Sequence, residues 1–357
     1  MGVTKDMINA KNILLFLVLL EHLLCFYFNN IINKGNLLDS VEYYTRGLEV
    51  NLSKDLPYLL VPGRGILLVT SLLVNIFSNF LILSLFFSFV SFIPYYDIIR
   101  KYFEKINNEN NVFLKFTFLF LLFIPSAHIW LTGIFKEALI FPLMYFLLLS
   151  LVKNRDKFLK ADILFYSFLI FLLRPYLICH ILLAYFITNF KYLNKKIILI
   201  VSILFMFFSL MFFKVTSSFV DISNLSKLMS EINRFSQAQG NSFIDVEKTS
   251  YLQRLIYMLF RPLFFDVSTK SQYLYSFENA ILIIWFLVFL YNIIIKKIKA
   301  NFLFLNIYFI LSLLVWLFIG IYIYNYGLAS RMKVMIVPFM MIGVIISIKQ
   351  QLGEKNS

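Results

Sequence analysis

Apolar runs long enough to cross a bilayer recur along this sequence and constrain its fold more than any other feature. A spanning helix needs about 20 mostly apolar residues, because the hydrocarbon core is about 30 Å thick. Hydrophobic residues fill 61% of the 357 positions and charged residues only 15%, which excludes an ordinary soluble domain. We therefore expect an all-α, polytopic integral membrane protein, with residues 1–357 forming a single membrane domain.

About ten spanning helices, with a range of about nine to eleven, are predicted from these runs. They lie at 12–32, 77–97, 112–124, 137–152, 161–174, 176–190, 197–213, 279–295, 302–324 and 334–348. Prolines and glycines break the segment 57–76, so we expect a re-entrant or interfacial helix there. Residues 161–190 are interpreted as two short spans, since a single kinked helix would reverse the orientation of everything that follows.

Compact basic turns predict the orientation of the helices. "KNRDKFLK" and "KKIK" are short and dense in lysine and arginine, which favours the cytoplasmic side and places both termini there. The extracytoplasmic segments are then a first loop, 33–76, and a long loop, 214–278. The long loop contains "YLQRLIYMLFRPLFF", an amphipathic helix expected to lie at the membrane interface. The orienting role accounts for the formal net charge of +14, so no nucleic-acid partner is predicted.

Charged and polar groups gather at the predicted extracytoplasmic ends of the helices. Charge at membrane depth is costly and marks functional positions, and arginine grips phosphate oxygens with two parallel hydrogen bonds. The candidates for binding a diphosphate or other substrate group are Arg46, Arg64, Lys136, Arg174, Arg261 and Arg331. Glu137 and His128 are the candidate catalytic bases, followed by Asp266, Glu278, Asp39 and Glu42.

Several of these residues also have a purely structural interpretation. Arg64 or Arg331 alone could reach the lipid headgroups, and His128 beside Trp130 could belong to an interfacial belt. Lys136 and Glu137 could cap a helix. Inside the first span, Glu21 and His22 are interpreted as a locally satisfied polar pair rather than as a proton relay.

Known catalytic motifs are missing from the sequence. It contains no phosphate-binding glycine-rich loop, no HExxH and no G-x-S-x-G, and Cys25 and Cys179 show no metal-binding spacing. We therefore predict neither a metal nor another cofactor. Chemistry at the outer face would then need a substrate that arrives activated, such as a lipid diphosphate-linked sugar. Arginines would stabilise the leaving diphosphate, and a carboxylate or histidine would take the proton from the attacking hydroxyl.

Four stretches resemble the bacterial polysaccharide polymerases of the Wzy type. They are "IPSAHIWLTGIFKEALIF", "LLRPYLICHILLAYF", "YMLFRPLFFD…SFENAILIIW" and "NYGLASRMKVMIVPFM", and the resemblance covers about residues 40–345. It implies an inner-membrane glycosyltransferase with a periplasmic active site, as in O-antigen and lipopolysaccharide biosynthesis. Such an enzyme transfers a growing glycan from undecaprenyl diphosphate to a lipid-linked repeat unit, without nucleotide or metal.

The resemblance also implies residue roles and partners. Arg174, Arg261 and Arg331 would hold the diphosphate with help from Lys136, and Glu137 or His128 would act as the base. The implied partners are the undecaprenyl diphosphate-linked oligosaccharide and membrane lipids, and a chain-length regulator is a candidate partner.

Two other classes of function remain open from the sequence. A GT-C type glycosyltransferase would make Asp39 or Glu42 essential, while an O-antigen ligase would use the same donor with a different acceptor. A flippase or transporter for a lipid-linked oligosaccharide should carry buried charges on both sides of its midplane and usually internal repeats. The predicted outward clustering of charges favours the polymerase.

Overall fold

The computed structural model describes residues 5–32, 38–154, 160–190, 203, 206, 243–246, 248–267, 270–295, 297–323 and 325–355. Every regular element in these ranges is a helix, and the β structure within them is the isolated bridge between Phe243 and Asn325. The chain divides into two compact units, Met1–Pro175 and Tyr176–Ser357.

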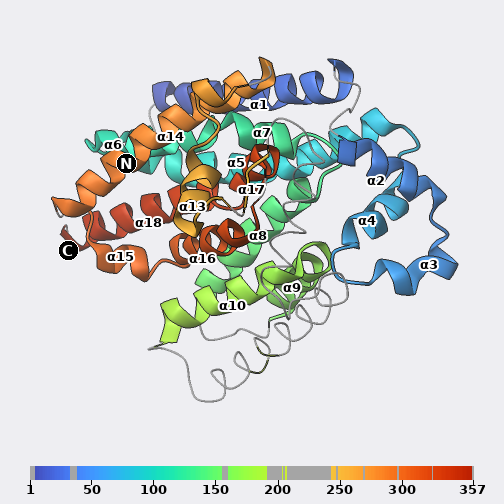
Figure 1. The fold of residues 1–357 in the computed structure, drawn as a ribbon. Coiled ribbons are helices and arrows are strands. Elements are labelled where there is room, and N and C mark those ends of the chain that lie inside the picture. Colours follow the sequence, from blue (N-terminus) through green and yellow to red (C-terminus); the bar gives the residue numbers. More distant parts are fainter. Residues whose placement is uncertain are drawn as a thin grey trace. The chain divides into compact units, whose positions relative to one another are not determined.

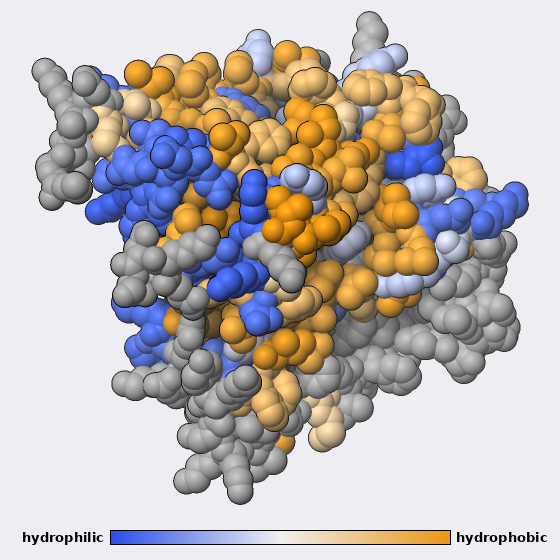
Figure 2. All heavy atoms as spheres, turned by 90° about the vertical axis from the view of Figure 1, so that its left-hand side faces the viewer, coloured by the Kyte–Doolittle hydropathy of each residue, from blue (hydrophilic) through white to orange (hydrophobic). Residues whose placement is uncertain are grey.

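Five helical stretches in the described ranges are long and apolar enough to cross a membrane. They are Met7–Ile32, Phe80–Asn107, Val112–Leu131, Gln272–Ile294 and Tyr326–Gly353. Apolar side chains also cover much of the surface seen in Figure 2, as expected where lipid rather than water is the solvent. A helical membrane protein is therefore confirmed, whereas the count of ten spans and the cytoplasmic termini stay predictions.

Some predicted features fall outside the described residues. These are the span 197–213 apart from residues 203 and 206, most of the long loop up to residue 242, and residues 33–37 of the first loop. The predicted span 137–152 lies inside an 18-residue helix. Residues 161–190 form two separate helices, as predicted, because the chain leaves the helical conformation at Arg174 (φ −149°, ψ 88°), the residue before a proline.

The first unit is built around one long helix. Its elements are α1 (Lys5–Phe26) with the π-helical turn η1 (Tyr27–Ile32), α2 (Leu38–Glu49), α3 (Leu52–Leu59), α4 (Gly65–Val74), α5 (Phe80–Asn107), α6 (Val112–Leu122), α7 (Pro125–Leu131), α8 (Lys136–Lys153) and α9 (Ala161–Leu173). Helices α1, α5 and α7 pack against one another (Figure 1). Helix α8 packs against α5 and α9, and α4 packs against α2 and α9.

The segment 57–76 contains the end of α3, a turn, and α4. Gly63 makes the turn with φ +91°, a conformation open to glycine at no steric cost. Its amide donates to the carbonyl of Leu172 at 2.8 Å. A Cβ on Gly65 would lie 2.8 Å from the Leu172 backbone, so only glycine allows this approach. The broken helix is as predicted, and its re-entrant placement in the membrane stays a prediction.

The second unit contains eight described helical elements. They are α10 (Pro175–Asn189), α13 (Tyr251–Phe260), η3 (Phe264–Asp266), α14 (Lys270–Ile294), α15 (Ala300–Phe304), α16 (Ile307–Tyr322), α17 (Tyr326–Lys333) and α18 (Val337–Lys355). Helix α13 covers the first ten residues of the predicted amphipathic helix, which ends at Phe260 rather than at Phe265, and its place at the membrane interface stays a prediction. It begins at a capping box formed by Ser250 and Gln253 and packs against α14, α16 and α17. Helices α16 and α18 lie side by side (Figure 1).

Candidate functional site

A buried ion pair joins the start of α8 to the end of α9. Glu137, in the first turn of α8, is fully buried, and Arg174 is 8% exposed. Arg174 Nη2 donates to Glu137 Oε1. Since α8 and α9 pack together, residues 37 positions apart in sequence meet here. Removing two charges from water costs several kcal/mol of free energy per ion, so burying this pair among apolar helices opposes folding unless the two charges stay paired.

Lys136 and the turn before α4 complete this group of residues. Lys136 Nζ donates to the Gly63 carbonyl oxygen at 2.7 Å. We call Gly63, Lys136, Glu137 and Arg174 the α8 cluster. Next in the same turn, the Arg64 guanidinium lies 3.5 Å from the ring centroid of Tyr58. The cluster therefore combines two cations with one carboxylate, and this excess of positive charge suits an anionic ligand.

Both ring nitrogens of His128 face groups outside the α8 cluster. Its Nδ1 lies 2.9 Å from Nδ1 of His22, and its Nε2 lies 2.8 Å from the Leu122 carbonyl oxygen. The ring stacks on Tyr95 at 4.8 Å between centroids. Fully buried, His128 is part of the core of this unit. The interpretation of Glu21 and His22 as a local pair is wrong for His22, whose partners lie on α5 and α7 because those helices pack against α1.

The candidates of the first loop lie on α2. Arg46 Nη2 pairs with Glu42 Oε1 at 2.7 Å across one helical turn, and both side chains are exposed. Such a pair contributes about 0.3–0.5 kcal/mol. Asp39 lies in the first turn of the same helix and is half-buried. None of the three belongs to the α8 cluster as defined above.

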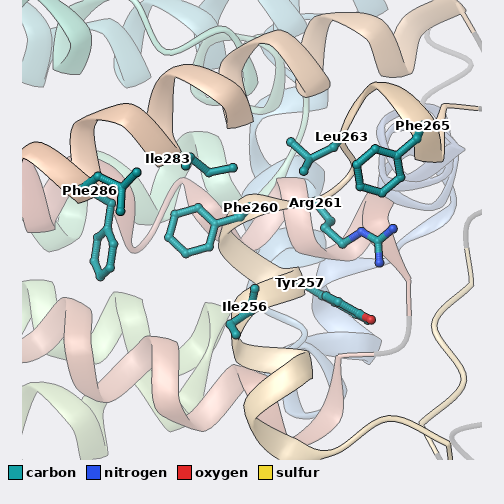
Figure 3. A pocket seen from close by; sticks show the side chains of 9 residues that line it. Ile256, Tyr257, Phe260, Arg261, Leu263, Phe265, Ile283 and Phe286 are labelled. Atoms are coloured by element: carbon teal, nitrogen blue, oxygen red, sulfur yellow. The ribbon is translucent and has the colours of Figure 1, made fainter.

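In the second unit, Arg261 and Asp266 form a bidentate pair just after α13. Arg261 Nε donates to Asp266 Oδ2 at 2.6 Å, and Nη2 donates to Oδ1. Burial alone would lower the pKa of Arg261, but the hydrogen bond and charge of Asp266 raise it above its ordinary value. The guanidinium lies between the rings of Tyr257 and Phe265 (Figure 3), at 4.6 and 5.1 Å from their centroids.

A cavity of about 430 Å³ lies beside this pair, between α13 and α14. Its lining is apolar apart from Arg261 and the Tyr257 hydroxyl, and Figure 3 shows Phe260, Ile283 and Phe286 along it. The cavity is of a size that accepts part of a hydrocarbon chain.

A second buried polar group joins α14 to α17. Lys333 and Glu278 are 1% and 2% exposed. Lys333 Nζ donates to Asn279 Oδ1, and Asn279 Nδ2 donates to the Pro262 carbonyl oxygen at 2.8 Å. Sequence reasoning named Glu278 but missed Lys333 and Asn279. The available signal was a lysine directly before the apolar run that forms α18.

The predicted arginines are distributed over both units. Arg174 belongs to the first unit, whereas Arg261 and Arg331 belong to the second, where Arg331 is half-buried on α17. Within the first unit, Glu137 pairs with Arg174, and Lys136, the residue before Glu137, binds the Gly63 carbonyl oxygen. A diphosphate cradle that also includes Arg261 and Arg331 stays a prediction.

No family model matches this chain, and neither does a curated protein or a solved structure. Within the part of the chain that the structure describes, no group of three or more His, Cys, Asp or Glu side chains is placed to hold a metal ion. The side chains of the α8 cluster and the apolar helices that hold them are therefore the features that bear on function.

Proposed function

We propose that this protein is an oligosaccharide repeat-unit polymerase of the bacterial inner membrane. It would transfer a growing glycan from undecaprenyl diphosphate to a lipid-linked repeat unit at the periplasmic face. The observation that supports this most directly is the buried Glu137–Arg174 pair, with Lys136 preceding Glu137 in the chain and bound to Gly63. It combines anion-binding groups and a carboxylate within a helical membrane protein.

The α8 cluster suits a diphosphate leaving group. A guanidinium binds two phosphate oxygens at once, and a lysine adds a point charge. In the resting protein, Glu137 neutralises Arg174, which avoids the large cost of a buried unpaired charge. An arriving diphosphate would compete with Glu137 for the same guanidinium. Donor binding would thus release the carboxylate for chemistry only when the substrate is in place.

The transfer then follows from these roles. The acceptor hydroxyl oxygen forms a bond to the anomeric carbon as the bond from that carbon to the diphosphate oxygen breaks. The hydroxyl proton passes to Glu137, and the diphosphate leaves with the bonding electrons. Arg174 and Lys136 stabilise its growing charge. His128 is a weaker candidate for the base, because both of its ring nitrogens already face other groups.

The rival functions would depend on other residues or on fewer of the residues in the α8 cluster. A GT-C type glycosyltransferase would depend on Asp39 or Glu42, yet Glu42 pairs with Arg46 on the exposed side of α2. A ligase would share the donor site and differ in its acceptor. A flippase would need the cations for its headgroup but no base, so Glu137 would matter to it only as the partner of Arg174 and not as a proton acceptor.

Purified protein incubated with its lipid-linked repeat unit tests the proposal. We expect a ladder of glycan lengths on a gel, which is lost in Glu137→Gln and kept in the control Glu42→Gln. In cells, a deletion strain should carry single repeat units on its surface glycan. Free uncapped polymer in that strain would indicate the ligase, and loss of all capped lipid would indicate the flippase. A full ladder from Glu137→Gln would reject the assigned base.

A further inference from the structure

Two histidines from distant parts of the sequence meet inside the first unit. His22 on α1 is 1% exposed, and His128 on α7 is fully buried. Their Nδ1 atoms are 2.9 Å apart. Each Nε2 faces a backbone carbonyl oxygen, Ser88 O at 3.0 Å from His22 and Leu122 O at 2.8 Å from His128. All four ring nitrogens therefore lie at hydrogen-bonding distance from a partner.

The number of hydrogens these contacts need exceeds what two neutral rings carry. A carbonyl oxygen only accepts, so both Nε2 atoms must carry a hydrogen. The two Nδ1 atoms need one more between them, since two lone pairs at 2.9 Å would repel each other. That makes three N–H groups, whereas two neutral imidazoles supply two. The geometry is complete only when the pair holds one additional proton.

Ser91 does not remove this requirement. Its hydroxyl lies 3.4 Å from Nε2 of His22 and could in principle donate there. The hydroxyl has a single hydrogen, and two better acceptors lie closer. These are the carbonyl oxygens of Ser88 and Leu131, both at 2.8 Å. When the Ser91 hydroxyl donates to either of these carbonyl oxygens, Nε2 of His22 must still donate its own hydrogen to the Ser88 carbonyl oxygen.

Aromatic rings border both imidazoles. The Tyr95 ring stacks on His128 at 4.8 Å, and the Phe92 ring lies 5.5 Å from His22. Aromatic faces attract cations, most strongly where water is excluded. The other ionisable groups on the helices packed around the pair are Lys5, Asp6, Lys11, Glu21 and Cys25 on α1; Tyr95, Tyr96, Asp97, Arg100, Lys101, Tyr102, Glu104 and Lys105 on α5; and Lys136, Glu137, Tyr145 and Lys153 on α8. Of these, Tyr95 contacts an imidazole, while Lys136 and Glu137 bind Gly63 and Arg174.

We propose that His22 and His128 form a proton-binding site that holds one proton for the pair and fastens α1 to α7. With the proton bound, every ring nitrogen has a matching partner. Without it, either the bridge between the rings or one carbonyl contact is lost, and the α1–α7 contact weakens. The site is a different one from the α8 cluster, and the inference stands whether or not the protein is a glycosyltransferase.

Nitrogen NMR of the protein in lipid nanodiscs, labelled with ¹⁵N at histidine, tests the stoichiometry. The chain has three histidines, so the variant His180→Phe leaves only the pair labelled. Titration from alkaline to acidic pH should show both rings changing together as one proton enters per pair. Two independent protonations, or two neutral rings throughout from pH 9 to pH 5, would overturn the proposal.

A second measurement tests whether the shared proton stabilises the contact between α1 and α7. We expect the melting temperature of the wild type, and of the control His180→Phe, to fall as pH rises through the titration seen by NMR. His22→Phe and His128→Phe should each remove this dependence to the same extent. Equal pH dependence in all four proteins would show that the shared proton does not fasten the helices.

Discussion

Separate and joint replacement of Glu137 and Arg174 distinguishes a pair kept for function from one kept for stability. Glu137→Met leaves a guanidinium that is 8% exposed without its carboxylate, and Arg174→Met leaves a fully buried carboxylate without its guanidinium. Removing one partner of a buried pair typically costs 3–5 kcal/mol, so we expect each single variant to lose about that much unfolding free energy. The double Met variant removes both charges and should return to within about 1 kcal/mol of the wild type.

The assay combines stability with turnover. Unfolding free energies are measured in detergent micelles or bicelles, and transfer is measured with the lipid-linked repeat unit on a gel. The exposed pair of Arg46 and Glu42 is the matched control, where Arg46→Ala should cost no more than about 0.5 kcal/mol and keep the glycan ladder. The double Met variant should be stable but inactive.

Two results would refute this reasoning. If the losses of Glu137→Met and Arg174→Met simply add in the double variant, the cost does not come from an uncompensated buried charge. If the double Met variant recovers both stability and full glycan ladders, the pair is structural and the proposed role in transfer is wrong.

Three further predictions concern the same helices and the second unit. Arg174→Lys keeps the positive charge but loses the bidentate hydrogen bonding of a guanidinium, so glycan chain length on a gel should fall sharply. A wild-type ladder would count against the role of Arg174 in binding the diphosphate. Gly65→Ala places a Cβ 2.8 Å from the Leu172 backbone and should cost about 1–3 kcal/mol in unfolding free energy; no loss would mean that the turn is not held by that contact. Lys333→Met leaves the side-chain oxygen Oδ1 of Asn279 and the nearby Glu278 carboxylate buried without the lysine ammonium. We expect it to lower the free energy of unfolding by more than about 1 kcal/mol; an unchanged melting curve would contradict this.

The helical membrane architecture was predictable because lipid imposes one simple rule on the backbone. A chain in hydrocarbon must satisfy its amides internally, so long apolar runs had to become helices, as the stretch Phe80–Asn107 shows. The break at Arg174 was also predictable, since the residue before a proline disfavours the helical conformation. The same holds for the broken segment 57–76, where Gly63 adopts a positive φ.

The partners of the buried polar groups were not predictable from spacing. Glu137 and Arg174 are 37 residues apart, and His22 and His128 are 106 apart. Apolar side chains surround these helices on nearly every face, so no polar stripe in the sequence indicates which faces meet. That is why His22 was assigned a neighbour on its own helix, and why Lys333 was overlooked in a basic stretch at a helix end.

The short helix α7 links the two buried polar sites of the first unit. The chain passes from His128 through the turn 132–135 into Lys136 and Glu137, so whatever fixes α7 also fixes the start of α8. Asn29 donates to the Ile129 carbonyl oxygen at 2.8 Å and to Thr132 Oγ1 at 2.9 Å, which adds to the histidine contact. Reactive groups work only when the elements that carry them are held in place. His22 on α1 and Asn29 on η1 both contact α7, so we expect changes to either residue to alter the geometry of the α8 cluster even though neither belongs to it.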